Sequence, residues 1–442
     1  MNEISEKVKA AGVVGAGGAG FPTHVKLEAK AEILLVNGAE CEPMLRTDQQ
    51  LMAQSPELLI RGLSLAMQAT GASTGIIALK DKYKDAIAAL QPLLSTGMRI
   101  EILRDIYPAG DEVITLWMTT GRRVPPGGIP IHVGAVVNNP QTLMNVARAM
   151  DGTPVTSRTF TVTGAVKRPL TVTTPIGTPL SEMLELAGGP TCDPAAFIEG
   201  GPMMGRLVDD LSQPVTKTTG GLIVLPAGHL LIVRKRQTME SVLRIAKTVC
   251  EQCCYCTELC PRHIIGHELP PHLIIRSVNH NRLGSPSVVR SALTCSECGV
   301  CEAYACPVGI SPMRVNMALK AEFRAKNLRY EGPLNPADPM AENRLIPSSR
   351  LVSRLNLKPW YPPQAPLLPE EYAPEKVSIL LKQHTGVPAV PVVKKGDRIK
   401  KGELVAELHA GSLGARLHAS IDGIVAEVTG SAVEIRNGGD HT

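Results

Sequence analysis

The chain has 442 residues and a formal net charge of +5, with 44% hydrophobic and 20% charged residues. This length predicts two to four domains with sizeable apolar cores. The charge is too weak and too evenly mixed to indicate a nucleic-acid partner, and the absence of a run of about 18 apolar residues predicts no membrane span.

The first region, residues 1–155, alternates helical patterns with short apolar strands. Such alternation predicts an α/β domain with a parallel sheet. We expect a polar amphipathic helix at Met1–Ala11, strands at Ile33–Val36, Gly75–Leu79 and Ala135–Val137, and helices at Pro56–Thr70 and Lys82–Leu90.

A glycine-rich loop occupies Gly12–Thr23 in this region. Dense glycine lets the backbone approach a phosphate or a flat ring and supplies amide donors. No clear strand precedes the loop, so it matches the ordinary dinucleotide-binding fingerprint poorly. A tight structural turn is the alternative interpretation.

The second region, residues 156–235, predicts a small β-grasp module. The alternating run Thr159–Thr163 and the segment Leu170–Val172 predict a hairpin, and Ser181–Ala187 predicts a helix that Gly188 and Gly189 end. Gly221–Val233 is apolar but cut by a proline and a glycine, so we expect buried strands there.

The third region, residues 236–330, begins with a helical pattern at Met239–Val249 and holds nine of the 11 cysteines between Cys250 and Cys306. Such local clustering in a long chain indicates metal ligation in a reducing compartment. Two ferredoxin-type motifs are present. They are Cys250-x-x-Cys253-x-x-Cys256-x-x-x-Cys260-Pro261 and Cys295-x-x-Cys298-x-x-Cys301-x-x-x-x-Cys306-Pro307.

In two-cluster ferredoxins the fourth cysteine of each motif ligates the other cluster. We therefore expect two 4Fe–4S clusters, one held by Cys250, Cys253, Cys256 and Cys306, and the other by Cys295, Cys298, Cys301 and Cys260. Zinc is the alternative, because paired C-x-x-C motifs often bind it. Cys254 lies off the ligand spacing and is interpreted as a packed thiol.

The last third of the chain predicts a linker and an all-β domain. Residues 331–374 are rich in proline, above all Leu357–Pro374, and predict an extended linker. From Glu375 onward, short Val- and Ile-rich strands alternate with glycines. Two near-copies, Val393–Asp397 and Ile399–Glu403, favour a small β barrel or sandwich in residues 375–442.

Four segments of the first region resemble, in order, the flavin domain of the NADH-oxidising subunit of respiratory complex I. They resemble the C subunit of the Rnf electron-transport complex still more closely. The segments are Gly17–Thr23 with Lys26, Asn37–Pro43, Tyr107–Glu112 and Asn138–Thr142.

This resemblance implies a Rossmann-like domain that binds FMN non-covalently, with NADH stacked on the flavin. Lys26 would oppose negative charge on the flavin or its phosphate, and Glu40 and Glu42 would hydrogen-bond the nicotinamide or ribose. Ala39 stands where complex I usually has Asp. The cofactor-binding residues that the resemblance implies are Gly15, Gly17, Gly18, Gly20, Phe21, Lys26, Asn37, Glu40, Glu42, Gly110, Asp111, Asn138, Asn139 and Thr142.

The other regions resemble further domains of the same relatives. Residues 156–235 are similar to their soluble-ligand-binding β-grasp (SLBB) domain. The C-terminal region, with Ser420–Val425, is similar to a biotinyl-lipoyl-like barrel-sandwich hybrid. Its hairpin carries Leu413-Gly414-Ala415 and no Met-Lys-Met, so we expect a scaffold role without biotin or lipoate. The expected fold class is a multidomain chain of α/β and α+β parts, with a two-cluster ferredoxin-like helical domain at 236–330.

The hybrid domain is last here, whereas it precedes the flavin domain in the Rnf subunit. This order, the length and the loop sequences resemble the cobalamin reductases of propanediol-utilisation microcompartments over essentially the whole chain. That resemblance implies that electrons from NADH pass through FMN and both clusters to cobalamin. Cobalamin would be reduced from cob(III)alamin through cob(II)alamin to cob(I)alamin for a B12-dependent diol dehydratase. It also implies a cytoplasmic location inside a bacterial microcompartment, with an adenosyltransferase and a shell protein as partners.

Two other functions remain open from the sequence. One is an Rnf-type electron-input subunit that feeds ferredoxin or another acceptor, and the other is an iron–sulfur relay without flavin. No Asp-x-His-x-x-Gly pattern indicates a histidine-ligated cobalamin. Four histidines follow the first cysteine motif and are interpreted as packing or surface residues, with an axial cobalt ligand as the alternative; they are His263, His267, His272 and His280.

Overall fold

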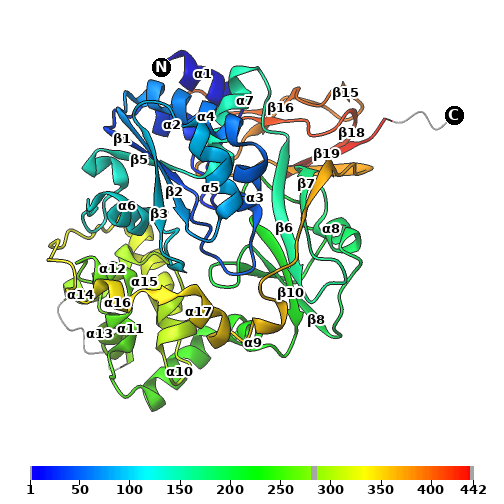
Figure 1. Cartoon of the computed structure of the whole chain (residues 1–442). Helices are drawn as coiled ribbons and strands as arrows, with labels where there is room; N and C mark the ends of the chain where they lie inside the picture. The colour runs from blue at the N-terminus through cyan, green and yellow to red at the C-terminus, as the bar shows by residue number, and fades with distance from the viewer. Residues whose placement is uncertain (1, 280–285, 439–442) are drawn as a thin grey trace.

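The computed structural model describes residues 2–279 and 286–438. His280 therefore lies outside the described residues. In the described part, no helix is long and apolar enough to cross a membrane. Figure 1 shows the N-terminal α/β domain above the helical cysteine-rich part, with the β-rich regions beside both.

The N-terminal domain is built on a four-stranded parallel sheet of order β3-β2-β1-β5. The alternation in the sequence correctly predicted this parallel sheet. The strands are β1 (Ile33–Asn37), β2 (Thr74–Lys80), β3 (Met98–Leu103) and β5 (Ala135–Asn138). The helices are α1 (Glu3–Ala10), α2 (Thr23–Leu27), α3 (Thr47–Gln54), α4 (Pro56–Thr70), α5 (Lys84–Leu90), α6 (Glu112–Thr120) and α7 (Pro140–Met150), with 3-10 turns at Gln91–Leu93 and Pro130–Val133.

Both faces of this sheet are buried. Leu34 and Val36 point into a core shared with α1, α4 and α7, while the alternate residues Ile33 and Leu35 point into a second core with α6. Because side chains alternate along a strand, a continuous apolar run such as β1 serves two cores. Helices therefore cover both sides of the sheet, as in doubly wound folds.

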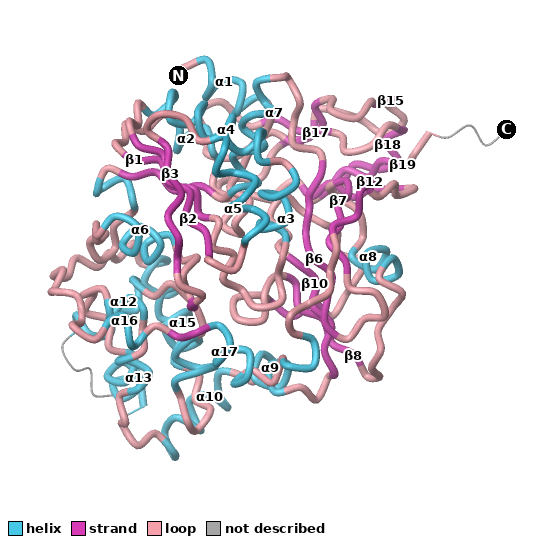
Figure 2. The backbone as a smooth tube through the Cα atoms, in the orientation of Figure 1, coloured by secondary structure: helices cyan, strands magenta, loops and turns pink. Residues whose placement is uncertain are grey.

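The β-grasp domain has a six-stranded mixed sheet of order β12-β7-β6-β10-β8-β9. The β6–β7 hairpin is antiparallel, β10 returns parallel to β6, and α8 packs against the sheet. Figure 2 shows this sheet beside the N-terminal domain. Its elements are β6 (Ser157–Gly164), β7 (Leu170–Pro175), α8 (Leu180–Leu186), β8 (Ala195–Glu199), β9 (Arg206–Val208), β10 (Gly221–Pro226) and β12 (Leu367–Glu371).

The prediction of strands throughout Gly221–Val233 is wrong in its second half. β10 ends at Pro226, and helix α9 (Leu230–Arg236) begins shortly after it. His229 caps this helix by accepting a hydrogen bond from the Leu231 backbone nitrogen. The proline and glycine that interrupt the apolar run therefore separate a strand from a helix.

The cysteine-rich domain is helical and packs around the two motifs. α10 coincides with the predicted helix Met239–Val249. The elements are α10 (Met239–Val249), α11 (Tyr255–Glu258), α12 (Pro261–Ile264), α13 (Pro271–Asn279), α14 (Pro286–Arg290), a 3-10 turn at Ser291–Thr294, the π-helical turn η4 (Cys301–Ala305) and α15 (Pro312–Ala325).

Residues 331–374, expected to be an extended linker, are instead packed against neighbouring parts of the fold. β11 (Ile346–Pro347) pairs with β4 (Ile106–Tyr107), and β12 adds an edge strand to the β-grasp sheet. Helix α17 (Ser348–Arg354) buries Leu351 fully. The proline content concealed these apolar contacts. The remaining short elements are α16 (Ala341–Arg344) and a 3-10 turn at Lys358–Trp360.

The C-terminal domain is all-β, as the sequence predicted. Its strands form a four-stranded and a three-stranded sheet around one core. The near-copies make the same turn, because Asp397 and Glu403 each accept a hydrogen bond from the backbone nitrogen three residues earlier. The strands are β13 (Lys376–Leu380), β14 (Val390–Pro391), β15 (Arg398–Ile399), β16 (Leu404–Glu407), β17 (Leu417–His418), β18 (Gly423–Val428) and β19 (Ala432–Arg436).

The packing of α4 on α7 yields a stability prediction. A Cβ added at Gly62 would overlap the Leu143 backbone oxygen, whereas one added at Gly228 would meet no atom within 4 Å. Gly62→Ala is therefore expected to lower the free energy of unfolding by about 1–3 kcal/mol, and the control Gly228→Ala to change it little. Urea unfolding followed by circular dichroism measures both. If Gly62→Ala were as stable as the wild-type protein, the prediction would be contradicted, because α4 and α7 could then move apart without a cost in free energy.

Candidate functional site

The eight predicted cluster cysteines line two separate cavities. Cys250, Cys253, Cys256 and Cys306 line the first, here called the first thiol cavity, together with Cys254 and His272. Cys260, Cys295, Cys298 and Cys301 line the second thiol cavity. Each cavity takes three cysteines from one motif and the fourth from the other. The structure thus groups the thiols as the ferredoxin exchange predicts.

The thiols stand around the walls of these cavities. In the described part of the chain, no three His, Cys, Asp or Glu side chains are grouped so that they could hold a metal ion. A cubane cluster, unlike a single ion, needs thiolates spread around its corners. The four-thiol lining of each cavity fits that requirement.

The two motif loops share one backbone conformation. Gln252 and Glu297, each third in its motif, have φ of 55° and 60°, and Cys254 and Gly299, each fifth, have φ of 65° and 77°. These left-handed positions let a short loop curl around a cavity. Cys254 therefore occupies the place of a glycine, and its thiol donates to the Gln252 carbonyl oxygen at 3.2 Å.

Backbone amides and burial determine the electrostatics around the thiols. The Glu297 nitrogen donates to Cys295 Sγ at 3.4 Å, and the Ile310 nitrogen to Cys306 Sγ at 3.2 Å. Burial, with neighbouring thiols adding to it, raises the pKa of Cys256 to about 12. A metal centre binds the thiolate form, so loading these cavities would release protons.

A third cavity, of about 870 Å³, opens beside the glycine-rich loop. We call it the nucleotide cavity. Its volume lies in the range of small-molecule and cofactor sites. The predicted residues on its wall are Gly17, Gly18, Asn37, Glu40, Glu42, Gly110 and Asn139.

Seven predicted residues do not line this cavity. Thr142 Oγ1 accepts a hydrogen bond from the Ala16 nitrogen at 2.8 Å, and the Gly15 nitrogen donates to the Phe21 oxygen at 2.9 Å, so both support the loop. Lys26 Nζ donates to the Val137 oxygen at 2.9 Å. The full set is Gly15, Gly20, Phe21, Lys26, Asp111, Asn138 and Thr142.

The cavity wall offers polar atoms suited to a flavin nucleotide. Asn37 Nδ2 donates to the Gly110 oxygen at 2.7 Å, but Asn37 Oδ1 is buried with no partner among the described residues. A Cβ added at Gly18 would meet no atom within 4 Å, so the loop leaves open space next to its backbone. Since a buried polar atom without a partner is costly, Asn37 fits a site completed by a ligand.

Burial perturbs both predicted acids. The Glu40 carboxylate accepts from the Asp48 nitrogen at 3.1 Å, and burial together with the charge of Asp48 raises its pKa. Glu42 accepts from the nitrogens of Met203 and Met204 at 2.9 and 2.7 Å, and burial raises its pKa. Perturbed carboxyls in a cavity are typical of functional sites.

Arg158 and Asp48 also line the cavity and were missed in the sequence. The Arg158 guanidinium donates to the oxygens of Ala16 and Thr219 at 2.8 and 2.7 Å, and burial lowers its pKa to about 10. Asp48 accepts from Asn139 Nδ2 at 2.7 Å. Arg158 lies at the start of β6. A charged residue within an otherwise buried strand is unusual, and this feature of the sequence could have indicated a functional role for Arg158.

The C-terminal domain contributes to the same cavity. Thr385 Oγ1 donates to the Ala19 oxygen at 2.7 Å, and the Thr385 nitrogen donates to the Gly20 oxygen at 3.0 Å. Lys382, Gln383 and His384 line the wall beside it. This domain therefore holds the tip of the glycine-rich loop, in addition to the expected scaffold role.

Two contacts connect the N-terminal domain, here called the flavin-type domain, to the region of the second thiol cavity. Tyr107 is fully buried, and its hydroxyl donates to the Cys298 oxygen at 2.6 Å. Asp111 caps α6 and forms a buried ion pair at 3.0 Å with Arg262, which closely follows Cys260. Both contacts join the Tyr107–Glu112 segment to the second thiol cavity.

Two of the described histidines after the first motif have side-chain partners, whereas His263 Nδ1 is buried without a partner among the described residues. His267 Nε2 is 2.8 Å from the Val124 oxygen, and His272 Nδ1 is 2.6 Å from Thr257 Oγ1. Burial lowers the pKa of His263, His267 and His272. For His267 and His272 these contacts agree with packing roles.

Four family models match the chain in order. They are the Nuo51 FMN-binding domain over residues 8–148, the SLBB domain over 159–207, a 4Fe-4S dicluster domain over 249–311, and the RnfC barrel sandwich hybrid domain over 367–440. These matches bear out the predicted fold class. The chain is thus an oxidoreductase-type protein with an FMN-binding and an iron–sulfur domain.

Two relatives match nearly the whole chain. It is 60% identical to "Cobalamin reductase PduS" of Salmonella typhimurium, over 99% of this chain and 97% of that protein. The protein of the same name from Citrobacter freundii is 59% identical over 98% and 96%. The C subunit of the Na(+)-translocating ferredoxin:NAD(+) oxidoreductase complex of Acetobacterium woodii is 38% identical, over 59% of this chain and 58% of that protein. The chain belongs to the cobalamin reductase PduS family.

The cysteine exchange can be tested by spectroscopy. If Cys306 completes the first cavity, Cys306→Ser is expected to perturb the same paramagnetic signal of the reduced protein as Cys250→Ser, because both change one cluster. The control Cys254→Ser should leave both signals and the iron content unchanged. A Cys306→Ser spectrum that matches Cys301→Ser would contradict the exchange.

Arg158 provides a test of the nucleotide cavity. Arg158→Met leaves the Ala16 and Thr219 oxygens without their buried donor, so FMN affinity of the apoprotein is expected to fall by about tenfold or more. Fluorescence titration with FMN measures it. The control is Arg148→Met, since Arg148 is exposed on α7 away from this cavity. Unchanged affinity in Arg158→Met would refute the supporting role.

Proposed function

We propose that this protein passes electrons from NADH through FMN and two 4Fe–4S clusters to cobalamin. The observation that carries the proposal is the hydrogen bond that the Tyr107 hydroxyl, in the flavin-type domain, donates to the backbone oxygen of Cys298, which lines the second thiol cavity. The near full-length match to proteins named cobalamin reductase supports the acceptor. FMN supplies the needed chemistry, because a flavin takes a hydride and releases electrons singly.

The glycine-rich loop and its neighbours would hold the FMN. Gly17 and Gly18 let the backbone approach the nucleotide, Asn37 offers its unpaired Oδ1, and Asn139 is fixed by Asp48. Arg158 and Thr385 keep the loop closed from two other domains. This preorganisation reduces the entropy lost on binding.

The acidic wall would orient the nicotinamide nucleotide. Glu40 and Glu42 lie on the cavity wall with raised pKa values, so each is suited to hydrogen-bond a ribose hydroxyl or a carboxamide. Ala39 is buried, and its methyl side chain offers no polar contact, while its backbone oxygen accepts from the Tyr83 hydroxyl at 3.0 Å.

The eight cysteines would ligate the clusters in the two cavity groups, and the protein would reduce cob(III)alamin to cob(II)alamin and cob(I)alamin. This would regenerate the cofactor of a B12-dependent diol dehydratase. We place the protein in the cytoplasm inside a bacterial microcompartment, with an adenosyltransferase and a shell protein as partners. The basis is its resemblance to the family in propanediol utilisation.

An Rnf-type role, feeding ferredoxin or another acceptor, is the second candidate. The match to the C subunit of the Acetobacterium complex favours it, but that match covers only 59% of this chain. A flavin-free relay is the third. The unpartnered Asn37 Oδ1 in an 870 Å³ cavity speaks for a bound flavin.

Anaerobic purification with iron, sulfide and flavin analysis, followed by NADH titration, tests the proposal. We expect flavin bleaching on NADH addition, then the visible spectrum of cob(II)alamin when cob(III)alamin is added. Omitting NADH is the control. A flavin that stays oxidised in excess NADH would refute NADH as donor, and reduced protein that leaves cob(III)alamin unchanged would refute the acceptor.

A further inference from the structure

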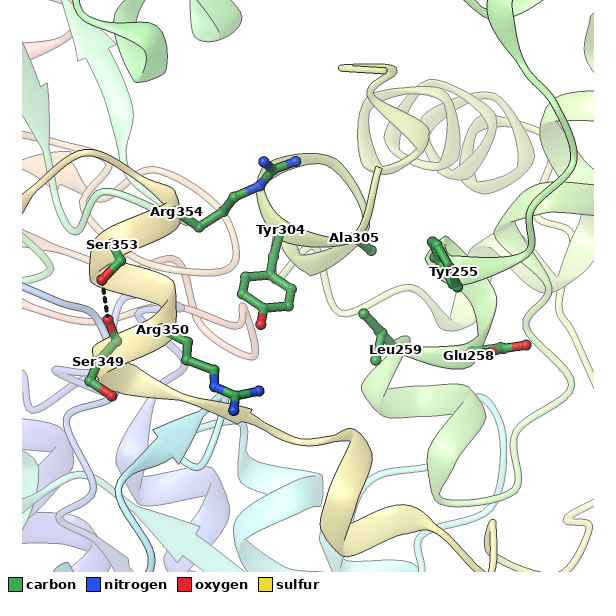
Figure 3. Close-up of a pocket in the computed structure, with 9 residues that line it drawn as sticks. All are labelled: Tyr255, Glu258, Leu259, Tyr304, Ala305, Ser349, Arg350, Ser353 and Arg354. Atoms are coloured by element: carbon green, nitrogen blue, oxygen red, sulfur yellow. Dashed lines mark hydrogen bonds between the residues drawn. The ribbon is translucent and has the colours of Figure 1, made fainter. Parts of the chain in front are cut away.

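An open cavity of about 820 Å³ lies between the cysteine motifs and α17 (Figure 3). Its walls come from α11, from η4 and from one side of α17. Figure 3 shows the Tyr304 ring and the Arg350 side chain extending into the same space from η4 and α17. None of its lining residues belongs to the nucleotide cavity. A ligand could therefore bind here while the nucleotide cavity is filled.

Three residues that line this cavity directly precede cysteines of the two motifs. Tyr255 directly precedes Cys256, and Ala305 directly precedes Cys306, both of which line the first thiol cavity. Leu259 directly precedes Cys260 of the second thiol cavity. Electron transfer slows steeply with distance, so a redox-active ligand placed here would lie close to the end of the relay.

The wall combines aromatic surface with two arginines, while the one carboxylate among its lining residues, Glu258, is paired with Arg344 at 3.8 Å. Tyr255 is 52% exposed, which is unusual for a large aromatic side chain. Arg350 makes no hydrogen bond or ion pair with any described residue, and Arg354 donates once, to the Cys306 oxygen at 3.3 Å. These two like charges are one helical turn apart and repel each other. Such an arrangement favours a ligand that carries an anionic group on a large apolar body.

We propose that this cavity is the electron-exit site and that it binds the corrinoid directly. The inference rests on the proposed function and names the site of its substrate. A corrinoid has a broad ring edged by methyl groups and amide arms, and its nucleotide loop carries one negative phosphodiester. Tyr255, Leu259 and Tyr304 suit the ring edge. Arg350 and Arg354 suit the phosphodiester, since guanidinium groups bind phosphate strongly.

NADH, the donor proposed above, supplies all the electrons that the reduction of the corrinoid requires. NADH gives up a hydride, so NADH and two cob(III)alamin yield NAD⁺, one proton and two cob(II)alamin. Each electron leaves the relay singly, and cobalt loses an axial ligand as it is reduced. No further oxidant or reductant is required.

Binding to the oxidised holoprotein tests the site without turnover. Arg350→Glu is expected to weaken hydroxocobalamin binding by about tenfold in equilibrium dialysis, because it replaces a charge-assisted contact with repulsion. Cobinamide lacks the phosphodiester, so its binding should change much less. Arg324→Glu is the matched control, since Arg324 is exposed on α15 of the same domain and does not line the cavity.

A second variant guards against loss of structure. Ser349 is exposed on the cavity side of α17, so Ser349→Trp should fill the space and weaken both corrinoids alike. Wild-type iron content and wild-type flavin reduction by NADH would show that the clusters and the flavin site of each variant are intact. Wild-type affinity for cobalamin in both variants would overturn the corrinoid site while leaving the proposed function standing. If the two variants bound free corrinoid normally and were impaired only in reducing corrinoid held by an adenosyltransferase, the corrinoid site would also be overturned. The cavity would then be a docking site for that protein.

Discussion

The exchange of one cysteine between two motifs is the constraint on which the arrangement of the molecule depends. Cys260 and Cys306 each cross to the cavity of the other motif. Neither cavity is complete until both motifs are folded, so the helical domain must assemble as one unit around α10, α13 and α15. Metal loading and folding of this domain are therefore coupled. The same crossing sets the two thiol cavities side by side, so that the path between them does not depend on a movable domain interface.

The nucleotide cavity depends on tertiary contacts between domains and not on their order along the chain. Its loop comes from the N-terminal domain, Arg158 from the β-grasp domain, and Thr385 from the C-terminal domain. Lys217 strengthens this junction: its Nζ donates to the Gly12 and Arg416 oxygens at 2.7 and 2.8 Å. Burial lowers the Lys217 pKa to about 7. The C-terminal domain can therefore hold the glycine-rich loop although it is last in the chain. What matters is that the segment after β13, which carries Thr385, lies against that loop in the folded protein.

Much of the fold was predictable because it rests on local patterns. Helix α4 spans the predicted Pro56–Thr70, and the β1 and β2 strands follow from continuous apolar runs. The grouping of eight thiols followed from motif spacing. Arg158 could not be found this way, because its role depends on carbonyl groups of Ala16 and Thr219, which are distant in the sequence. Residues 331–374 were misjudged for the same reason, since their partners are the β4 strand and the β-grasp edge.

The positions of the nucleotide cavity, the two thiol cavities and the cavity beside α17 also suggest a direction for the proposed electron transfer. Tyr107 and the Asp111–Arg262 pair join the flavin-type domain to residues of the second thiol cavity. The Arg-lined cavity beside α17 is lined by the residues that precede Cys256 and Cys306 of the first, and by the residue that precedes only one cysteine of the second, Cys260. With clusters in place, an electron would enter beside Cys298 and leave beside Cys256. Separate entry and exit faces allow a bulky acceptor to dissociate while the donor side is occupied. That separation would suit the proposed function, in which electrons arrive in pairs and leave one at a time.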